Sequence, residues 1–378
     1  MDIEQALPLL GGLSPQAFMQ KHWHKKPLLI RQAIGGMAPM LTRAELFDLA
    51  GREEVESRLI SSRREGGRTQ WQMRPGPIQR RSLPTLKTPN WTLLVQGLDL
   101  HLEAARAMLN RFRFVPDARL DDLMVSFATE GGGVGPHYDS YDVFLLQAQG
   151  RRRWRIARRF DTALRSDVPL KMLANFQAEQ EFVLEAGDML YLPPHYAHDG
   201  IAEQGECMTY SIGFRSPARA ELAQELLQRL ADQAGEGLDE QRYRDPAQAA
   251  TSAAALIPAA LEEFARQSVM AALKDPHALA QALGELLSEP KPQVWFEPGR
   301  LLIGRRGVVL DRRTRMLFDD RHVYINGESF RAAGQDAQLM RHLANERCLA
   351  TQEVARLSKE ALGLLKVWCA SGWLHPNK

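Results

Sequence analysis

The first hundred residues carry apolar side chains at helical spacing, interrupted by irregular connections. Ser14 before Pro15 predicts a helix start at SPQAFMQKHWHKK, because a serine N-cap and a proline in the first turn both suit a helix N-terminus. Thr42 predicts a second start at TRAELFDLA. In NWTLLVQGLDLHLEAARAMLNRF, residues 90–112, apolar positions fall on one face and predict a long amphipathic helix. Residues 62–90, rich in Arg, Gly, Pro and Gln, predict an exposed β-excursion or loop around TQWQM.

From about Leu120 the pattern changes to short apolar or alternating runs separated by turn residues. These runs are DLMVSFA, YDVFLLQ, GRRRWRI, EFVLEAGD, MLYLPP and MTYSIGF. Several short strands at this spacing are typical of a β-sandwich or barrel, so we expect a barrel over about residues 120–215.

Beyond Ser216-Pro217 the chain becomes rich in Ala, Leu and Glu at helical period, which predicts a helical module over residues 217–290. A proline-punctuated linker follows. RLLIGRRGVVLD and RHVYINGESF then predict strands, the second with a tight turn at Asn326-Gly327. Helices expected at AQLMRHLANE, TQEVARLS and SKEALGLLKVWCASG complete the pattern of a winged-helix unit over 291–378. With residues 1–216, we therefore expect three domains.

Composition narrows the class of protein. Apolar residues make up 44% of the chain and charged residues 25%, which excludes a fibrous or largely disordered protein. The three cysteines, Cys207, Cys348 and Cys369, are too few and too far apart for a disulfide framework or a cysteine-based zinc site. The N-terminus lacks a basic signal region, and no run approaches the length of a membrane span. We therefore predict a cytoplasmic protein that does not contact membranes.

His137 and Asp139 stand two positions apart in GGGVGPHYDSYDVF, so on a strand both side chains would project from one face. His195 and His198, near the end of EAGDMLYLPPHYAHDG, are both candidates for a third ligand. We prefer His198, because the Pro193-Pro194 turn needs a few residues before the chain re-enters the barrel mouth. Two imidazoles and one carboxylate on one face of an octahedron are the ligands of non-haem iron(II) oxygenases, which keep three positions open for cosubstrate and dioxygen.

The strand GRRRWRI adds a basic residue that faces inward. Alternation places Arg152 on the same side as Trp154 and Ile156, which we expect to face the core. A buried guanidinium needs an anion. One alternative is an internal salt bridge to an aspartate or glutamate, and the other is the distal carboxylate of 2-oxoglutarate, which arginine can bind with two parallel hydrogen bonds.

Three segments together resemble a known family: HWHKKPLLI, DDLMVSFATEGGGVGPHYDSYDVFLLQAQGRRRWRI and EAGDMLYLPPHYAHDG. They are similar to the cupin-type Jumonji-C (JmjC) oxygenases, and most closely to the bacterial ribosomal oxygenases, which hydroxylate arginine on ribosomal proteins. The resemblance covers essentially the whole chain. It implies an α+β fold with N-terminal helices, a double-stranded β-helix barrel, a helical dimerisation region and a C-terminal winged helix.

Carried over to this chain, the resemblance implies iron ligands at His137, Asp139 and His198, with Arg152 binding 2-oxoglutarate. Many relatives have lysine at the position of Arg152, whereas the bacterial branch resembles this chain in using arginine. His195 departs from the family, which usually has glycine there. Three hydroxyl side chains on predicted barrel strands are further candidates for holding the cosubstrate: Ser126, Thr209 and Ser211.

The implied reaction uses Fe(II) and O2, and couples decarboxylation of 2-oxoglutarate to succinate with C–H hydroxylation. The implied substrate is an arginine side chain of a large-subunit ribosomal protein, the sixteenth by number. A protruding arginine calls for acidic or aromatic groups at the mouth of the site, and Tyr138, Tyr141 and Asp142 are candidates. The broad apolar stripe of ALIPAALEEFARQSVMAALKD must be buried. It can pack against the chain's own barrel or against a second copy, and the resemblance favours a homodimer through residues 217–290.

Two other classes of function remain open. Residues 217–290 carry a net charge of −6 and residues 291–378 a net charge of +6. A basic winged helix could bind nucleic acid, with the barrel as a ligand sensor. However, the recognition helix expected at SKEALGLLKVWCASG is largely apolar with two lysines, so we predict no direct nucleic-acid binding. A cupin that has lost its metal is the third class, and the complete triad with Arg152 argues against it.

Overall fold

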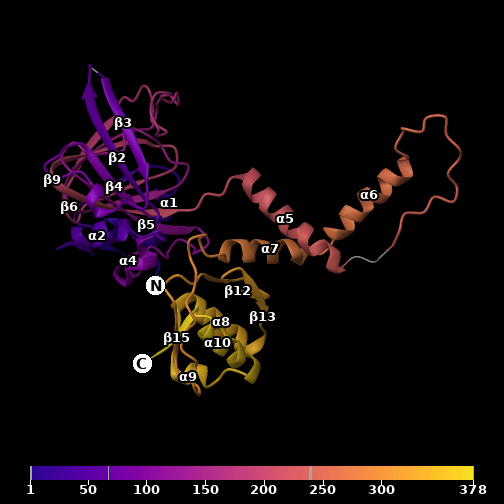
Figure 1. Cartoon of the computed structure of the whole chain (residues 1–378). Coiled ribbons are helices and arrows are strands. Elements are labelled where there is room, and N and C mark those ends of the chain that lie inside the picture. Colours follow the sequence, from indigo (N-terminus) through magenta and orange to yellow (C-terminus); the bar gives the residue numbers. More distant parts are fainter. Residues whose placement is uncertain (1, 67, 238–240, 378) are drawn as a thin grey trace. The chain divides into compact units, whose positions relative to one another are not determined.

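The computed structural model describes residues 2–66, 68–237 and 241–377 (Figure 1). The chain divides into two compact units, Met1–Ser216 and Pro217–Lys378. Within the described ranges, no helix is both long and apolar enough to cross a bilayer.

The N-terminal helices begin where their caps predict. Helix α1 spans Pro15–Lys21, and the Ser14 hydroxyl accepts a hydrogen bond from the Ala17 N–H at 3.2 Å. Helix α2 spans Arg43–Ala50 behind a capping box, in which the side chains of Thr42 and Glu45 each accept a hydrogen bond from the other residue's backbone N–H. Both predicted helix starts are confirmed.

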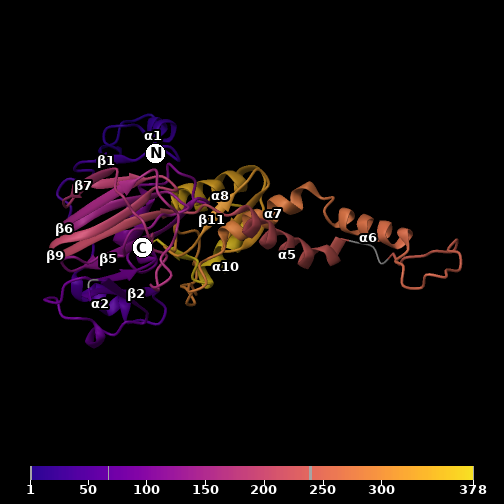
Figure 2. The ribbon, with the colours of Figure 1, turned by 90° about the horizontal axis from the view of Figure 1, so that it is seen from above.

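The first unit is built on an antiparallel sheet (Figure 2). Its strands are β1 (Leu28–Ile30), β2 (Ser57–Glu65), β3 (Arg68–Pro75), β4 (Trp91–Val95), β5 (Leu120–Ala128), β6 (Val143–Ala157), β7 (Gln180–Leu184), β8 (Met189–Leu192) and β9 (Ala197–Phe214). They pair in the order β1-β8-β6-β9-β5-β4-β2-β3, with β7 on β6. The predicted β-excursion around TQWQM is the ribbon β2–β3.

One predicted element is wrong. Residues 90–112 do not form a single helix but strand β4 followed by the short helices α3 (Leu98–His101) and α4 (Glu103–Asn110). Every residue of β4 is buried, and the strand pairs with β2 and β5 on its two sides. Gly97 then turns the chain with φ +62°, and Leu102 has extended backbone that separates the two helices.

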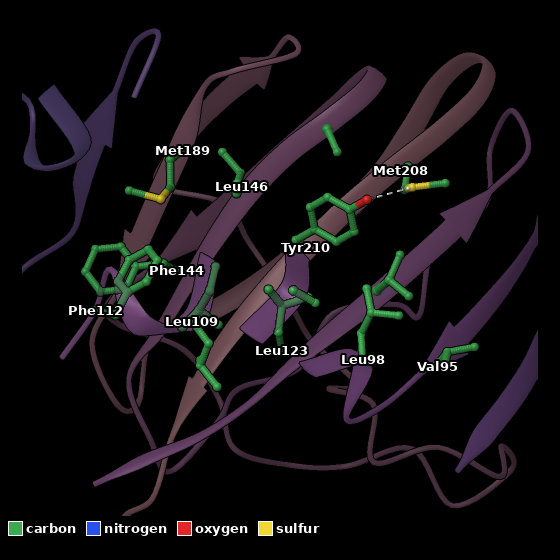
Figure 3. Packing of buried hydrophobic residues seen from close by; sticks show 14 of the residues in the cluster. Val95, Leu98, Leu109, Phe112, Leu123, Phe144, Leu146, Met189, Met208 and Tyr210 are labelled. Carbon is green, nitrogen blue, oxygen red and sulfur yellow. Dashed lines mark hydrogen bonds between the residues drawn. The ribbon is translucent and has the colours of Figure 1, made fainter. Parts of the chain in front are cut away.

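The two faces of β6 serve different purposes. Phe144 and Leu146 face a large core that also contains Met189 and Tyr210 (Figure 3). Phe18 of α1 and Leu46 of α2 belong to the same core. Val143 and Leu145 point the other way and pack in the cluster that contains Trp154 and Ile156, so Trp154 and Ile156 face inward as predicted. This second face forms the wall of the barrel interior.

The second unit opens with helices α5 (Arg219–Gly237), α6 (Ala259–Ala272) and α7 (Pro276–Ser288). It continues with strands β10 (Val308–Leu310), β11 (Met316–Phe318), β12 (His322–Ile325), β13 (Glu328–Arg331), β14 (Cys348–Leu349) and β15 (Leu374–Pro376) and helices α8 (Gly334–Glu346), α9 (Thr351–Val354) and α10 (Lys359–Ala370). The strands form two sheets, β14-β10-β15 and β11-β12-β13.

Local turn chemistry explains part of this unit. Asn326 and Gly327 both have positive φ, at +50° and +91°, and join β12 to β13 as the Asn-Gly pair predicts. The strand predicted for RLLIGRRGVVLD is confirmed only at Val308–Leu310, and residues 300–303 are not in a strand. Helix α7 packs on the sheet of β12, where a Cβ on Gly284 would lie 2.2 Å from Tyr324 Cζ.

A buried ion pair ties β10 to the C-terminal strand. Asp311 accepts hydrogen bonds from Arg313 Nε and from His375 Nε2, both at 2.8 Å. Burial raises the pKa of Asp311, but these hydrogen bonds outweigh it and hold the pKa at about 2, below the usual 3.8.

We expect Asp311→Asn to lower the free energy of unfolding by about 2 kcal/mol near neutral pH, the value of a pKa depressed by almost two units. Because the folded-state pKa is depressed, this contribution is present above the unfolded-state pKa of about 4 and is lost as the pH falls towards 2. Urea unfolding of the full chain at neutral pH and near pH 3 measures it. The exposed Asp320→Asn is the control, and an equal loss in the two variants would contradict the prediction.

Candidate functional site

His137 and His198 face each other at the mouth of the barrel. Their backbones form an isolated β-bridge, with His137 N–H to His198 O at 3.0 Å and His198 N–H to His137 O at 2.7 Å. The ring centroids lie 4.2 Å apart, and His198 Nε2 is 3.7 Å from Asp139 Oδ2. One ligand atom from each of His137, Asp139 and His198 lies within 4.8 Å of the others, so the three can share one ion.

Hydrogen bonds orient both imidazoles for this role. His137 Nδ1 lies 2.9 Å from Gly135 O, and His198 Nδ1 lies 3.0 Å from Tyr196 O. A ring that donates from Nδ1 keeps the lone pair of Nε2 free for a metal. Burial, and then the neighbouring His137, lower the pKa of His198 to about 4, so its imidazole is neutral near pH 7.

The glycine-rich loop before His137 allows this close approach. A Cβ on Gly133 would lie 2.5 Å from Gly200 O, and Gly135 has φ +76° with Met172 packed against it. Larger residues at these positions would push the loop away from β9. Gly133 therefore lets the loop lie close to Gly200 in β9, two residues after His198.

His195 lies beside the site but outside the triad. Its N–H donates to the backbone carbonyl of Asp139 at 2.8 Å, and its ring centroid is 5.8 Å from that of Tyr138. Its φ of +60° is the left-handed conformation that glycine adopts most easily, which agrees with the glycine usual in the resembled family. Among the described residues, the cluster of candidate ligands does not include His195.

Arg152 lies inside the barrel and is buried. Its side chain is 5% exposed, and its guanidinium carbon sits 5.6 Å from the centroid of the Trp154 ring. Nη1 donates to Ser126 Oγ at 3.2 Å, whereas Nε and Nη2 have no hydrogen-bond partner among the residues that the structure describes. No carboxylate in the described ranges forms an ion pair with Arg152. The structure therefore does not contain the internal salt bridge considered as one alternative for this residue. The two orphaned N–H groups fit a bound carboxylate.

The predicted hydroxyl side chains lie on the neighbouring strands. Ser126 of β5 pairs with Thr209 of β9, and Ser211 follows two residues along the same face. Thr209 Oγ1 donates to Gln147 Oε1 at 2.9 Å. Gln147 is fully buried and was not among the predicted residues, although a polar side chain at the end of the run VFLLQ was a signal for it. Ser126, Thr209 and Gln147 therefore give the interior a polar wall beside Arg152.

The three residues predicted to contact the substrate do not lie together in the structure. Tyr138 packs on Phe160 at the mouth, with ring centroids 5.1 Å apart. Tyr141 is 38% exposed; partial burial, followed by the charge of the adjacent Asp139, raises the pKa of its hydroxyl. Neither tyrosine is fully buried, so their role as substrate contacts stays a prediction.

Asp142 does not lie at the mouth, and its prediction as a substrate contact is corrected. Its carboxylate is fully buried, accepts a hydrogen bond from the Tyr191 hydroxyl and lies 3.1 Å from His24 Nε2. Tyr191 belongs to the core on the outer face of the sheet, so Asp142 fastens the N-terminal segment to β8. Burial raises the pKa of Asp142, against the opposing effects of Tyr191 and His24.

Comparison with known families assigns both units. Residues 107–222 match the JmjC domain, and residues 271–375 match the ROXA-like winged helix. An AraC-like ligand-binding domain also matches residues 176–289. The predicted fold class, a JmjC barrel with a C-terminal winged helix, is confirmed.

Individual relatives agree with these families. The chain is 35% identical over 329 residues to the ribosomal protein uL16 3-hydroxylase of Escherichia coli, covering 82% of this chain and 84% of the relative. It is 34% identical over 209 residues to a probable ribosomal oxygenase of Haemophilus influenzae, covering 54% and 50%.

A crystal structure of E. coli YcfD superposes with a TM-score of 0.82 at 29% identity, covering 97% of this chain and 98% of that one. A YcfD complex with cobalt and 2-oxoglutarate superposes with a TM-score of 0.79 at 29% identity, covering 97% and 99%. The predicted family is thus confirmed, and the chain belongs to the ribosomal oxygenases, the JmjC-type 2-oxoglutarate-dependent oxygenases.

Proposed function

We propose that this chain hydroxylates an arginine side chain of a large-subunit ribosomal protein, the sixteenth by number. The observation that carries the proposal is the pairing of a His-Asp-His cluster with a buried, unpaired Arg152 in one barrel. The E. coli relative named a uL16 3-hydroxylase supports the substrate. A ribosomal protein substrate also supports the predicted cytoplasmic location.

In this proposal His137, Asp139 and His198 would hold Fe(II), and a ligand set of two histidines and one carboxylate keeps positions for cosubstrate and dioxygen. When bound, the iron with O2 and 2-oxoglutarate supplies the oxidising power that inserts oxygen into a C–H bond, and 2-oxoglutarate leaves as succinate and carbon dioxide. Gly135 O and Tyr196 O hold the Nδ1 protons of the two histidines, which fixes the ring planes. Asp139 contributes the negative charge of the ligand set.

Arg152 orients the cosubstrate from the opposite end. Its free Nε and Nη2 donate to the distal carboxylate of 2-oxoglutarate, while Nη1 stays on Ser126. Thr209, Ser211 and Gln147 line the same interior and exclude water from the ion pair. Tyr138 and Tyr141 at the mouth contact the aliphatic stem or the guanidinium of the arginine substrate.

The proposal is tested by reconstituting the enzyme anaerobically with Fe(II) and adding ribosomal proteins, 2-oxoglutarate and O2. Mass spectrometry should find the mass of one added oxygen on an arginine of uL16, in step with succinate formation. Formation of succinate without modification of any ribosomal protein would contradict the proposed substrate. Modification of a residue other than arginine would contradict the site of hydroxylation.

The rival function, nucleic-acid recognition by the winged helix, lacks a suitable recognition helix. Helix α10 buries Leu362, Leu365 and Trp368 in the core of the second unit. Its exposed positions include Lys359 and Lys366 but also the apolar Val367. No observation on α10 favours this function.

We also propose that the chain is a homodimer through its helical region. Apolar side chains on and around α6 are exposed in the single chain, among them Leu256 at 72%, Ile257 at 61%, Val269 at 60% and Met270 at 58%. An apolar patch of this kind is costly in water and is typical of a subunit interface.

Light scattering should therefore report about twice the 42.6 kDa chain mass. Leu261→Glu, and independently Phe264→Glu, should shift the mass towards one chain, because a charge on this face opposes its burial. Phe264 also packs on Tyr243 within the chain, so Leu261→Glu is the cleaner variant. Glu262→Gln on the same helix is the control. A monomer at every accessible concentration would contradict the dimer.

A further inference from the structure

A strongly basic segment lies outside the barrel interior and has no part in the proposed reaction. Between Ser57 and Asn90 the chain carries eight arginines and lysines against one acidic residue, Glu65. Much of this segment is the ribbon β2–β3, which ends the sheet and projects beyond the other strands (Figure 1). Strand β3 is exposed at every position except the half-buried Trp71. An exposed edge of this kind is free to meet a partner.

The cross-strand register gives the ribbon two different faces. Ser62, Thr69 and Trp71 share one face and line a pocket against the glycine-rich loop and Phe176. The opposite face, here called the basic face, is formed by the pairs Ser61–Gln72, Arg63–Gln70, Glu65–Arg68 and Leu59–Arg74. Apart from Leu59 at its base and Glu65, every residue of the basic face can donate hydrogen bonds from its side chain.

The basic face keeps an excess of positive charge: it carries Arg63, Arg68 and Arg74 against Glu65, and Asp167 lies near enough for the charge of Arg68 to lower its pKa. Among the described residues, no carboxylate forms an ion pair with Arg63, Arg68 or Arg74, and Arg74 instead donates to Ser82 O at 2.8 Å. That contact places the turn carrying the exposed Arg80 and Arg81 beside the ribbon.

Strand β6 is the contrast. Its three outward arginines all have acidic partners: Arg151 with Glu185 and Glu203, Arg153 with Glu181 and Glu203, and Arg155 with Asp199. The surface arginines of the central strand thus form close ion pairs, whereas among the described residues Arg63, Arg68 and Arg74 of the ribbon form none. Arginines gathered on one projecting face attract an anionic partner.

The chemistry of the basic face selects the partner. Arginine and glutamine side chains on an extended ribbon can donate to successive phosphate oxygens. The basic face has no aromatic side chain on which bases could stack, so single-stranded binding by stacking does not fit. We propose that the basic face binds the phosphate backbone of folded RNA, and, resting on the proposed function, that this RNA is the ribosomal RNA that accompanies the substrate protein. The prediction that the chain does not bind nucleic acid directly was based only on the apolar character of the winged-helix segment, and it does not concern the ribbon.

The double variant Arg63→Gln with Arg68→Gln tests the proposal, because it removes two charges without altering the pocket face. Fluorescence anisotropy with a labelled RNA hairpin and the full chain should show about 60-fold weaker binding near 0.1 M salt. The slope of log affinity against log salt should shrink by about two. The control, Arg331→Gln with Lys366→Gln, removes two exposed charges from the second unit and should bind RNA like the unaltered chain.

Three results would overturn the proposal: unchanged RNA affinity in the ribbon variant, an equal or larger loss in the control, or equally tight binding of a polyglutamate peptide, which would indicate an acidic protein partner. Hydroxylation of an isolated uL16 peptide is measured separately and should be equal in the ribbon variant and the unaltered chain. If the chain binds RNA through the ribbon but hydroxylates no ribosomal peptide, the proposed function is wrong. The proposal that the basic face binds RNA would still be supported.

Discussion

Replacing His198 by alanine is expected to lower metal affinity and 2-oxoglutarate turnover by more than about 100-fold, since even losing an outer-shell partner of a ligand costs about 10- to 100-fold. The variant leaves His137 and Asp139 with a gap where the buried, neutral imidazole stood. Fe(II) titration under anaerobic conditions and succinate formation measure the two losses. Circular dichroism should show that the variant remains folded, because His198 is one residue of a long strand held between β6 and β5.

His195→Ala is the matched control, three residues away. It should keep metal affinity, because its ring lies outside the cluster and its backbone N–H still donates to Asp139 O. If His195→Ala abolishes metal binding while His198→Ala keeps full turnover, the third ligand has been assigned to the wrong histidine.

Much of the fold could be predicted because it depends on short-range chemistry. Ser14 and Thr42 begin helices through their own side chains, and Asn326-Gly327 makes its turn through local backbone preference. The run over Trp91–Val95 was different. A short, mainly apolar run fits a buried strand or a buried helix equally well. Pairing with β2 and β5 decides the matter, and those strands lie far away in the sequence.

The site shows the same division. Two-residue alternation placed Arg152, Trp154 and Ile156 inside the barrel, but it does not extend through the whole of β6. The register of β6 against β9 shifts between Gln147 and Arg152, and Gly150 within this stretch has φ +69°. As a result odd-numbered residues such as Gln147 face the interior before the irregularity, and even-numbered residues face it afterwards.

This switch of parity explains where two residues lie: Gln147, which was not predicted, and Asp142, which was wrongly predicted at the mouth. Gln147 joins Thr209 in the interior. Strict alternation counted back from Arg152 would instead place Gln147 on the outer face. Asp142 shares the outer face with Phe144 and meets Tyr191 instead of a substrate. A bulge within a strand is set by its neighbours in the sheet, so a pattern taken from one strand cannot locate it.

Arg152→Ala is expected to raise the KM for 2-oxoglutarate by about 30-fold or more, the equivalent of at least about 2 kcal/mol for losing one partner of a buried charge pair. The affinity for the ribosomal peptide should change little, because the guanidinium lies on Ser126 and Trp154 inside the barrel and not at the mouth. Steady-state succinate formation at varied 2-oxoglutarate, and peptide binding measured apart from turnover, separate the two effects.

Arg153→Ala is the matched control one residue along the strand. Arg153 faces outward and pairs with Glu181 and Glu203, so its loss removes a surface charge pair of small energy and should leave the KM for 2-oxoglutarate unchanged.

Arg152→Lys should restore part of the affinity, because lysine keeps the charge but replaces two directed N–H groups by a single ammonium. Equal weakening of cosubstrate and peptide binding in Arg152→Ala would instead mean that Arg152 supports the barrel structure. The unpaired Nε and Nη2 argue for the carboxylate, since a purely structural arginine would leave two buried donors unsatisfied.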